Sequence, residues 1–485
     1  MSTPSTPSAQ RTVAASPAAP SRIAHPGITL AVIVGCQLMI GVDTSVVTIA
    51  LPGIRDALHL STSGLTWVQN SYMLTFGGLL LLGGRTGDIF GRRRVFAAGV
   101  VVFTLASLLG GVATSGGMLI AARALQGVAA AVAAPSAMAL IAANFEGAAR
   151  VRALSIFSGV TGAGAAIGML VGGVLTEAAS WRWVFFINLP VGLALAVLGP
   201  RFITETPRRP GRFDIAGTVT SVLGMTALVF GFIRAGSDGW RDGLTIGAFA
   251  ASIVLLAAFV AVEARVRQPI VPLRLFRDRD RSGAYLAMPL YVSGMFGAFF
   301  FLTQYLQEVL GYGPLRAGVA FLPMVGMQFT VLRILPRVLP RFGARPFVVT
   351  GAILVGLGLL WLSRVSADSG YVTGMLGPFL MMGAGGGIAI MPLNMTVLAK
   401  VPAEDAGAAS GVAQAVIWLG ASLGSAVLVT VFGAATRHTT GDPAHVMVHG
   451  LDVVFASGAA FALAALLVVL VALRPQRKQE QPAGA

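Results

Sequence analysis

The sequence predicts an all-α polytopic membrane protein with 14 transmembrane helices. Its 485 residues are 55% hydrophobic and only 11% charged, with a mean hydropathy of +0.81, whereas a soluble protein carries about 25% charged residues. Apolar stretches long enough to cross about 30 Å of hydrocarbon as helices recur along the chain. These stretches are continuous rather than alternating, which excludes a transmembrane β-barrel.

The 14 spans alternate in direction, and their loops differ strongly in charge. If the N-terminus is inside, 26 of the 34 Lys and Arg lie on the inner side, 7 on the outer side and Arg123 within a span. The positive-inside rule then predicts that both termini are cytoplasmic, in a plasma membrane. The net charge of +15 therefore reflects orientation rather than nucleic-acid binding. We place the spans at about 28–50, 65–84, 95–115, 118–144, 153–176, 183–203, 214–234, 243–263, 283–306, 316–336, 346–365, 371–398, 407–432 and 452–473.

The two ends of the chain lack apolar character. Residues 1–27 are rich in Ser, Thr, Pro and Ala and are expected to be a disordered cytoplasmic arm rather than a signal peptide, and 474–485 a cytoplasmic tail. The single cysteine, Cys36, excludes a disulfide framework and a cysteine metal site. His445 and His449 have helical spacing, but no acidic cluster accompanies them, so no metal site is predicted.

A repeat with an offset of 252 residues divides the chain into two halves. The pattern R-x-x-x-x-F-G-x-R occurs at 85–93 and 337–345, and S-G-V at 158–160 and 410–412. Transporters are often built from such internal repeats. We therefore predict a six-helix bundle at 28–203, two inserted helices with a cytoplasmic linker at 204–282, and a second six-helix bundle at 283–473.

Several motifs resemble one transporter family. G-G-R-T-G-D-I-F-G-R-R-R (83–94) is similar to the signature loop between the second and third helices of the major facilitator superfamily. The other motifs resemble those of its fourteen-helix drug:proton antiporters: D-T-S-V-V-T-I-A-L-P (43–52), R-x-x-Q-G (123–127), W-R-W-V-F-F-I-N-L-P-V-G (181–192), Q-Y-L-Q-E-V-L-G-Y-G-P-L-R-A-G (304–318) and E-D-A-G-A-A-S-G (404–411). The resemblance covers roughly 28–473 and implies proton-coupled export by a protein that works as a monomer.

The loop at 83–94 is predicted to form a cytoplasmic gate. Gly84 and Gly91 allow close helix approach, and Arg92 and Arg93 supply positive charge. Asp88 can face the positive N-terminal end of a helix. The repeat places the start of the thirteenth span, near 403–408, opposite Asp88 when the gate is shut. The alternative is that the arginines only set topology.

The fifth span resembles the antiporter helix motif of the family. Gly164, Gly168 and Gly172, with Gly173 beside them, form a ridge of small residues that lets another helix approach closely. The family pattern has a proline after the second of these glycines, where this chain has Met169. A general helix-packing face is the alternative interpretation.

Asp43 and Arg123 are the candidates for proton coupling. Charged residues inside a membrane are costly and usually functional. Low dielectric favours the neutral form of a carboxyl group, so Asp43, the only acid placed well inside a span, is expected to bind and release protons. Arg123 is its expected partner, indirectly through water or Gln126. The alternatives are a satisfied packing acid and a snorkelling arginine.

The spans offer few other polar side chains. Asn70, Tyr72, Gln126, Gln304 and Tyr305 are the candidates for lining a substrate cavity, although each could instead bond a neighbouring helix. Apolar walls with Met and Phe suit lipophilic substrates, and one acid suits neutral or monocationic ones.

No nucleotide-binding or hydrolase motif occurs in the sequence, which argues against an ATP-driven pump and against an enzyme. The expected coupling ion is the proton, with no other cofactor. The alternative function is an uptake carrier or facilitator for a small organic substrate.

Overall fold

The computed structural model describes residues 25–208, 213–266, 268–366, 369–402, 405–437, 439 and 442–474. Within these ranges the regular elements are helices, without a β-strand. The first half contains α1 (Pro26–Leu58), α2 (Thr62–Phe90), α3 (Arg92–Gly111), α4 (Gly116–Asn144), α5 (Gly147–Ala178), α6 (Trp183–Phe186) and α7 (Asn188–Phe202). The inserted segment contains α8 (Ile215–Ser237), α9 (Gly243–Glu263) and the short helix η1 (Leu273–Arg277).

The second half begins with α10, which continues into a π-helical turn. Its elements are α10 (Arg279–Gln304), η2 (Tyr305–Val309), α11 (Pro314–Ala320), α12 (Leu322–Phe342), α13 (Ala344–Leu362), η3 (Tyr371–Leu376), α14 (Gly377–Leu398), α15 (Ala406–Thr436) and α16 (Pro443–Ala472). Each predicted span coincides with one helix or with two consecutive ones, so the 14-helix fold is confirmed.

Thirteen helical segments in the described part of the chain are long and apolar enough to cross a membrane. The one predicted span that is not among these thirteen is the second, α2, which has 29 residues. It is less apolar because Gln69, Asn70 and Ser71 lie on it, and these side chains are buried against other helices rather than exposed to lipid. α2 packs against α4 in its own half and against α15 in the other.

The helices extend beyond the predicted spans. α16 begins at Pro443 rather than at 452, because a helix continues past the apolar segment until its cap. Asp452 therefore lies about 14 Å along α16, at a rise of about 1.5 Å per residue. α16 has 30 residues, more than the about 20 that cross the hydrocarbon, so the expectation that Asp43 is the only acid well inside a span stays a prediction.

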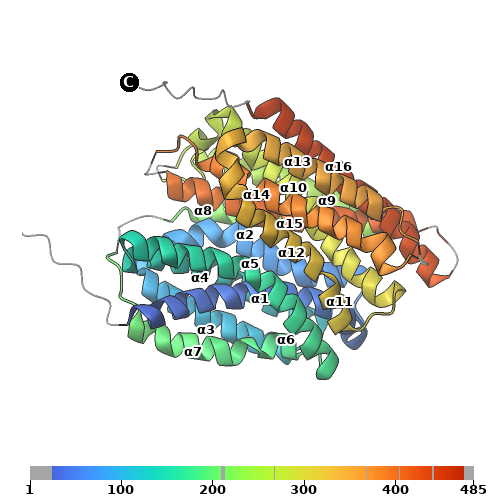
Figure 1. Ribbon diagram of the computed structural model, residues 1–485, viewed down its shortest axis with the longest axis horizontal. Coiled ribbons are helices and arrows are strands. Elements are labelled where there is room, and N and C mark those ends of the chain that lie inside the picture. The colour runs from blue at the N-terminus through green and yellow to red at the C-terminus, as the bar shows by residue number, and fades with distance from the viewer. Residues whose placement is uncertain are drawn as a thin grey trace, which may run out of the picture.

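The same helix neighbours occur in both halves. In the first half, α1 packs on α5 and α7, α2 on α4, and α3 on α4 and α7. In the second half, α10 packs on α15 and α16, α12 on α14, and α13 on α14 and α16. Figure 1 shows the first group of helices below the second. α8 joins them, since it packs on α9, α2 and α15.

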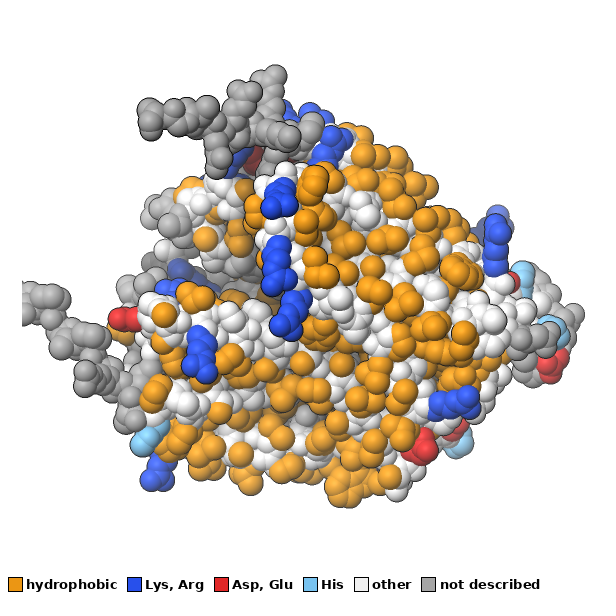
Figure 2. Space-filling model, in the orientation of Figure 1, with side chains coloured by type: hydrophobic (Ala, Val, Ile, Leu, Met, Phe, Trp, Pro, Cys, Tyr) orange, Lys and Arg blue, Asp and Glu red, His pale blue; other side chains and the backbone are white. Residues whose placement is uncertain are grey.

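The two halves meet at one end of the molecule and separate toward the other (Figure 1). We call the end where α1 begins and α16 ends the inner end, and the opposite end the outer end. At the outer end Arg55 of α1 forms an ion pair with Glu308 of η2, with 2.7 Å between Nη1 and Oε1. Nearby, Gln307 donates to the carbonyl of Ile49 at 3.0 Å. At this end α5 packs extensively on α11. It makes few contacts with α12, which continues from α11 toward the inner end. Figure 2 shows an indentation of the surface between the halves at the inner end.

Candidate functional site

Asp43 of α1 and Arg123 of α4 form a direct ion pair inside the first half. Arg123 Nη1 lies 2.5 Å from Asp43 Oδ2, and the two side chains are 2% and 0% exposed. The sequence predicted an indirect contact through water or Gln126. The contact is direct because α1 and α4 pack closely enough for the guanidinium to reach the carboxylate.

Two amide side chains complete the shell of donors around Asp43. Gln126 Nε2 and Asn188 Nδ2 each donate to Asp43 Oδ1 at 2.8 Å. Both amides also donate to Ser107 Oγ, at 2.8 and 3.2 Å. The carboxylate thus accepts hydrogen bonds from α4 and α7, while Ser107 links the network to α3. Hydrogen bonds to a charged form stabilise that form.

Arg123 is held from three further directions. Its Nη1 also donates to Gln126 Oε1 at 2.8 Å, and its Nε to the carbonyl of Val68 at 3.4 Å. Its guanidinium carbon lies 4.3 Å from the centre of the Tyr72 ring, a cation–π contact. Removing one member of such a buried pair strands the other charge, which typically costs about 3–5 kcal/mol.

Sequence reasoning did not select Asn188 or Ser107 as site residues. Asn188 stands in the quoted stretch 181–192, where an amide in an otherwise apolar segment was the available signal. Ser107 has no comparable signal, because a serine within a span commonly bonds its own helix, as its hydroxyl does here to the Phe103 carbonyl at 2.8 Å.

The predicted cavity residues are buried in helix packing. Asn70, Tyr72, Gln126, Gln304 and Tyr305 are each at most 2% exposed. Because they are so little exposed, these side chains do not line an open cavity in this conformation. The Tyr72 hydroxyl and the Asn70 amide have no hydrogen-bond partner among the described residues.

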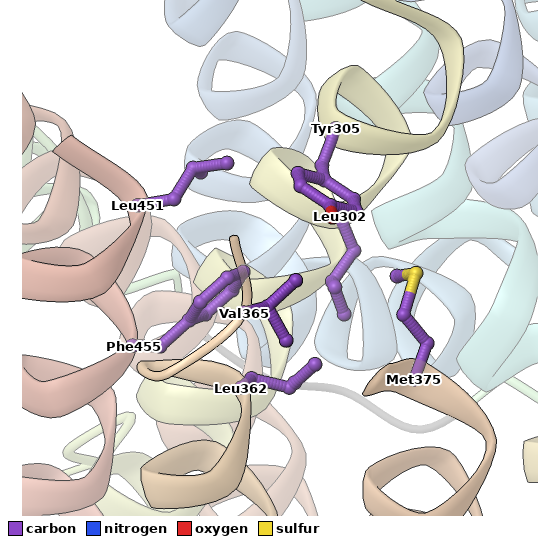
Figure 3. Close-up of a pocket in the computed structure, with 7 residues that line it drawn as sticks. All are labelled: Leu302, Tyr305, Leu362, Val365, Met375, Leu451 and Phe455. Atoms are coloured by element: carbon purple, nitrogen blue, oxygen red, sulfur yellow. The ribbon is translucent and has the colours of Figure 1, made fainter. Parts of the chain in front are cut away.

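Tyr305 lies beside a small enclosed cavity in the second half. The cavity has a volume of about 10 Å³, which is room for one water molecule at most. Figure 3 shows its lining residues: Leu302, Tyr305, Leu362, Val365, Met375, Leu451 and Phe455. The Tyr305 hydroxyl donates to the Ser366 carbonyl at 2.9 Å. Gln304, by contrast, bonds its own helix and donates to the Phe300 carbonyl at 3.3 Å.

The predicted gate loop forms contacts within the first half and with the inserted segment, where Arg85 Nη2 donates to Gln268 Oε1 at 2.7 Å. Arg92 Nη2 lies 2.8 Å from Asp88 Oδ1. Gly91 has φ +102°, a conformation that favours glycine, and a Cβ there would lie 2.9 Å from the Glu205 carboxylate. Glu205 accepts from the Arg93 backbone N–H at 3.0 Å. A Cβ on Gly84 would fit without a clash, since its nearest neighbour, Pro135, would lie 3.7 Å away.

Asp88 does not contact the described start of the thirteenth span. Asp405, the residue before α15, pairs instead with Arg274 of η1, with 2.6 Å between Nη2 and Oδ1. This ion pair holds the pKa of Asp405 below its usual range. Residues 403–404 lie outside the described residues. The halves are separated at the inner end, so the role of Asp88 in a closed gate stays a prediction.

The glycines of α5 pack against both halves. A Cβ on Gly164 would lie 3.3 Å from Gly41 of α1, and one on Gly168 would lie 2.1 Å from Ser45 Oγ. Gly172 similarly faces the α1 backbone. Gly173 instead faces α11 of the second half. Met169, which replaces the proline of the family pattern, lies within an uninterrupted α5.

Replacing Gly173 with leucine is expected to open the outer end. A Cβ at this position would lie 2.6 Å from the Leu315 Cα and 2.8 Å from the Pro314 carbonyl oxygen. These are backbone atoms that cannot rotate away, so the side chain disfavours the closed outer interface. The measurement is the distance between spin labels at Ala178→Cys and Val372→Cys, which are exposed positions on the two halves.

The label distance should increase in Gly173→Leu and stay unchanged in Gly247→Leu, where nothing lies within 4 Å of an added Cβ. The native Cys36 is buried and does not compete for the label. An unchanged distance in Gly173→Leu would show that this contact does not control the outer end.

A helical bundle whose two halves share one packing pattern, closed at one end and parted at the other, has the architecture of a membrane transporter. Comparison with known protein families shows which family of transporters this is. The model of the Major Facilitator Superfamily matches residues 33–425, and the chain belongs to this superfamily, a family of transporters rather than enzymes.

Its relatives include resistance and export proteins. The chain is 42% identical over 471 residues to the puromycin resistance protein pur8 of Streptomyces alboniger, covering 93% of this chain and 92% of the relative. It is 41% identical to the cephamycin export protein CmcT of Amycolatopsis lactamdurans, covering 94% of each chain. It is 35% identical to the multidrug efflux pump LfrA of Mycolicibacterium smegmatis, covering 86% and 83%.

Among solved structures, an auto-inhibited peptide transporter of the POT family has the same fold. The TM-score is 0.67, and the match covers 94% of this chain and 99% of that one. Its sequence is 16% identical, so the likeness concerns the fold alone.

Proposed function

We propose that the protein exports lipophilic drugs or natural products across the plasma membrane in exchange for entering protons. The observation that carries the proposal is the Asp43–Arg123 pair, in a chain related to resistance and export proteins. Of the ion pairs in the described part of the chain, it alone has both side chains almost fully buried. Such a costly pair is characteristically functional.

Protonation of Asp43 would neutralise its carboxylate and leave the positive charge of Arg123 without a counter-charge. The neutral carboxyl group no longer forms an ion pair with Arg123. Arg123 keeps its hydrogen bond to Gln126 and its cation–π contact with the Tyr72 ring. The link between α1 and α4 is therefore weakened. α1 also carries Arg55 and the Ile49 carbonyl at the outer interface, so movement of α1 reaches the contact between the halves.

In this conformation the proton and the substrate act at different places. Asp43 is fully buried behind its donors, so a substrate does not touch it. The proton and the substrate are therefore coupled through helix position rather than by direct competition for Asp43. One proton moving down 100 mV supplies about 2.3 kcal/mol, roughly fiftyfold in concentration for a neutral substrate.

The remaining features of the proposal follow from charge and composition. The inner end carries the arginine-rich loops and is assigned to the cytoplasm, with both termini on that side. Substrates are neutral or monocationic, in keeping with spans that are largely apolar and rich in Met and Phe. The partners are the substrate, protons and lipid rather than nucleic acid. The protein acts as a monomer without a further cofactor and catalyses no chemical reaction.

Transport in proteoliposomes with an imposed pH gradient tests the function. An antiporter accumulates its substrate in the acidic compartment, whereas a proton-coupled uptake carrier accumulates it in the alkaline one, in either orientation of the protein. A panel with puromycin, a cephamycin and lincomycin, the compounds named for relatives, is a direct starting point. We expect accumulation of at least one compound on the acidic side. Accumulation on the alkaline side would favour the uptake carrier.

A further inference from the structure

Two acidic side chains meet at the inner end of the inserted helices, far in sequence from Asp43. Asp214 is the N-cap of α8 and Glu263 is the last residue of α9. They are 5% and 3% exposed. Acidic side chains are almost never this buried unless they are paired.

Each carboxyl group has one satisfied oxygen and one without a partner. Asp214 Oδ1 accepts from the Gly217 N–H at 2.8 Å, and Glu263 Oε2 from the Val271 N–H at 3.1 Å. The other two oxygens, Asp214 Oδ2 and Glu263 Oε1, are buried without a hydrogen-bond donor.

The two unpartnered oxygens lie together above Gly217. A Cβ on Gly217 would be 2.5 Å from Asp214 Oδ2 and 2.8 Å from Glu263 Oε1. Glycine is therefore required here, because any side chain would displace one of the carboxyl groups. In the described part of the chain neither Asp214 nor Glu263 forms an ion pair with a basic side chain.

We propose that Asp214 and Glu263 bind one proton between them, as a second proton site at the inner end. Two buried carboxylates in contact cannot both be ionised, so such a pair holds a single proton more tightly than an isolated acid does. One O–H donor between the two oxygens satisfies both. A metal ion fits less well, because the two carboxyl groups are buried and leave little room for the several water molecules that Mg²⁺ keeps.

This site is connected to the second half through the linker. Val271, which donates to Glu263, lies three residues before Arg274, and Arg274 holds Asp405 at the start of α15. α15 is also the helix that packs on α2 across the two halves. Loss of the proton makes the carboxylates repel each other and loosens this anchor of the linker. A rise in pH at the inner end thus weakens the hold of the linker on α15.

The pH dependence of thermal stability tests the shared proton. The folded pair binds a proton that the unfolded chain releases, so stability is greatest in acid and falls as pH rises. We expect the melting temperature of the wild type to fall as pH rises above about 4, where the carboxyl groups of the unfolded chain ionise, and to level off once the folded pair has released its proton. In Glu263→Gln the amide donates to Asp214 at every pH, and this part of the fall should disappear. Glu146→Gln, at an exposed glutamate of the inner end, is the control and should behave like the wild type.

Asp214→Asn provides a second, independent variant, since asparagine caps a helix as well as aspartate does. It should flatten the same pH profile. Infrared difference spectra should show a protonated carboxyl band in the wild type that both variants lack. Proton-driven transport should persist in both, because Asp43 is untouched. Identical pH profiles in the wild type and Glu263→Gln, or stabilisation of the wild type by Mg²⁺ or Na⁺ that Glu263→Gln lacks, would overturn the shared proton.

Discussion

Asp43→Asn should abolish proton-driven accumulation of substrate and leave a folded protein in the membrane. Asparagine has the shape of a protonated aspartate, and its carbonyl oxygen still accepts from Gln126 or Asn188. In the proposed cycle the protein passes through the protonated state in every turnover, so it must tolerate a neutral group here. What the variant lacks is the ability to release and rebind the proton.

The measurement is accumulation against a substrate gradient in proteoliposomes, compared with downhill equilibration of the same substrate. We expect accumulation to fall to the background of empty liposomes, while downhill movement continues. Asp56→Asn is the matched control: it lies on the same helix, and its side chain is 74% exposed. If Asp43→Asn still accumulates substrate with an unchanged dependence on pH, Asp43 is not the coupling residue.

The fold was predictable because the membrane imposes it. Composition required helices, and the common offset of 252 residues paired regions that occupy equivalent places in the two halves. The ends of the helices were not predictable to the same degree. Hydropathy marks the part within hydrocarbon, whereas α1 continues to Leu58 and α16 starts at Pro443. Asp452 was therefore placed at the edge of a span.

The charged residues of the site were predictable from the sequence, because a charge inside the membrane is costly. The neutral residues that contact them were not, because helix packing determines which of them come together. Asp43 and Arg123 stood out because intramembrane charge needs a reason. Asn188 and Ser107 joined them only through the packing of α7 and α3. For an isolated polar residue such as Asn70, the sequence does not distinguish a cavity wall from a helix contact. The partner of Asp88 depends on which end of the transporter is open.

Arg123→Met should be among the most destabilising substitutions in the first half. Methionine fills much of the same volume but leaves Asp43 without its counter-charge in a fully buried site. Stranding one member of a buried pair typically costs about 3–5 kcal/mol. The full loss requires an ionised Asp43. In acid, Asp43 takes up a proton and much of the stability returns, so the loss should grow as pH rises.

A double-mutant cycle separates the charge pair from simple packing. Asp43→Asn/Arg123→Met contains no stranded charge and should recover most of the stability that Arg123→Met loses at alkaline pH. Its melting temperature should also lose the added dependence on pH. Arg150→Met, at an exposed arginine on α5, controls for the exchange of side chain and should have little effect. A double variant no more stable than Arg123→Met would mean that packing around Arg123, rather than its charge on Asp43, holds this part of the bundle together.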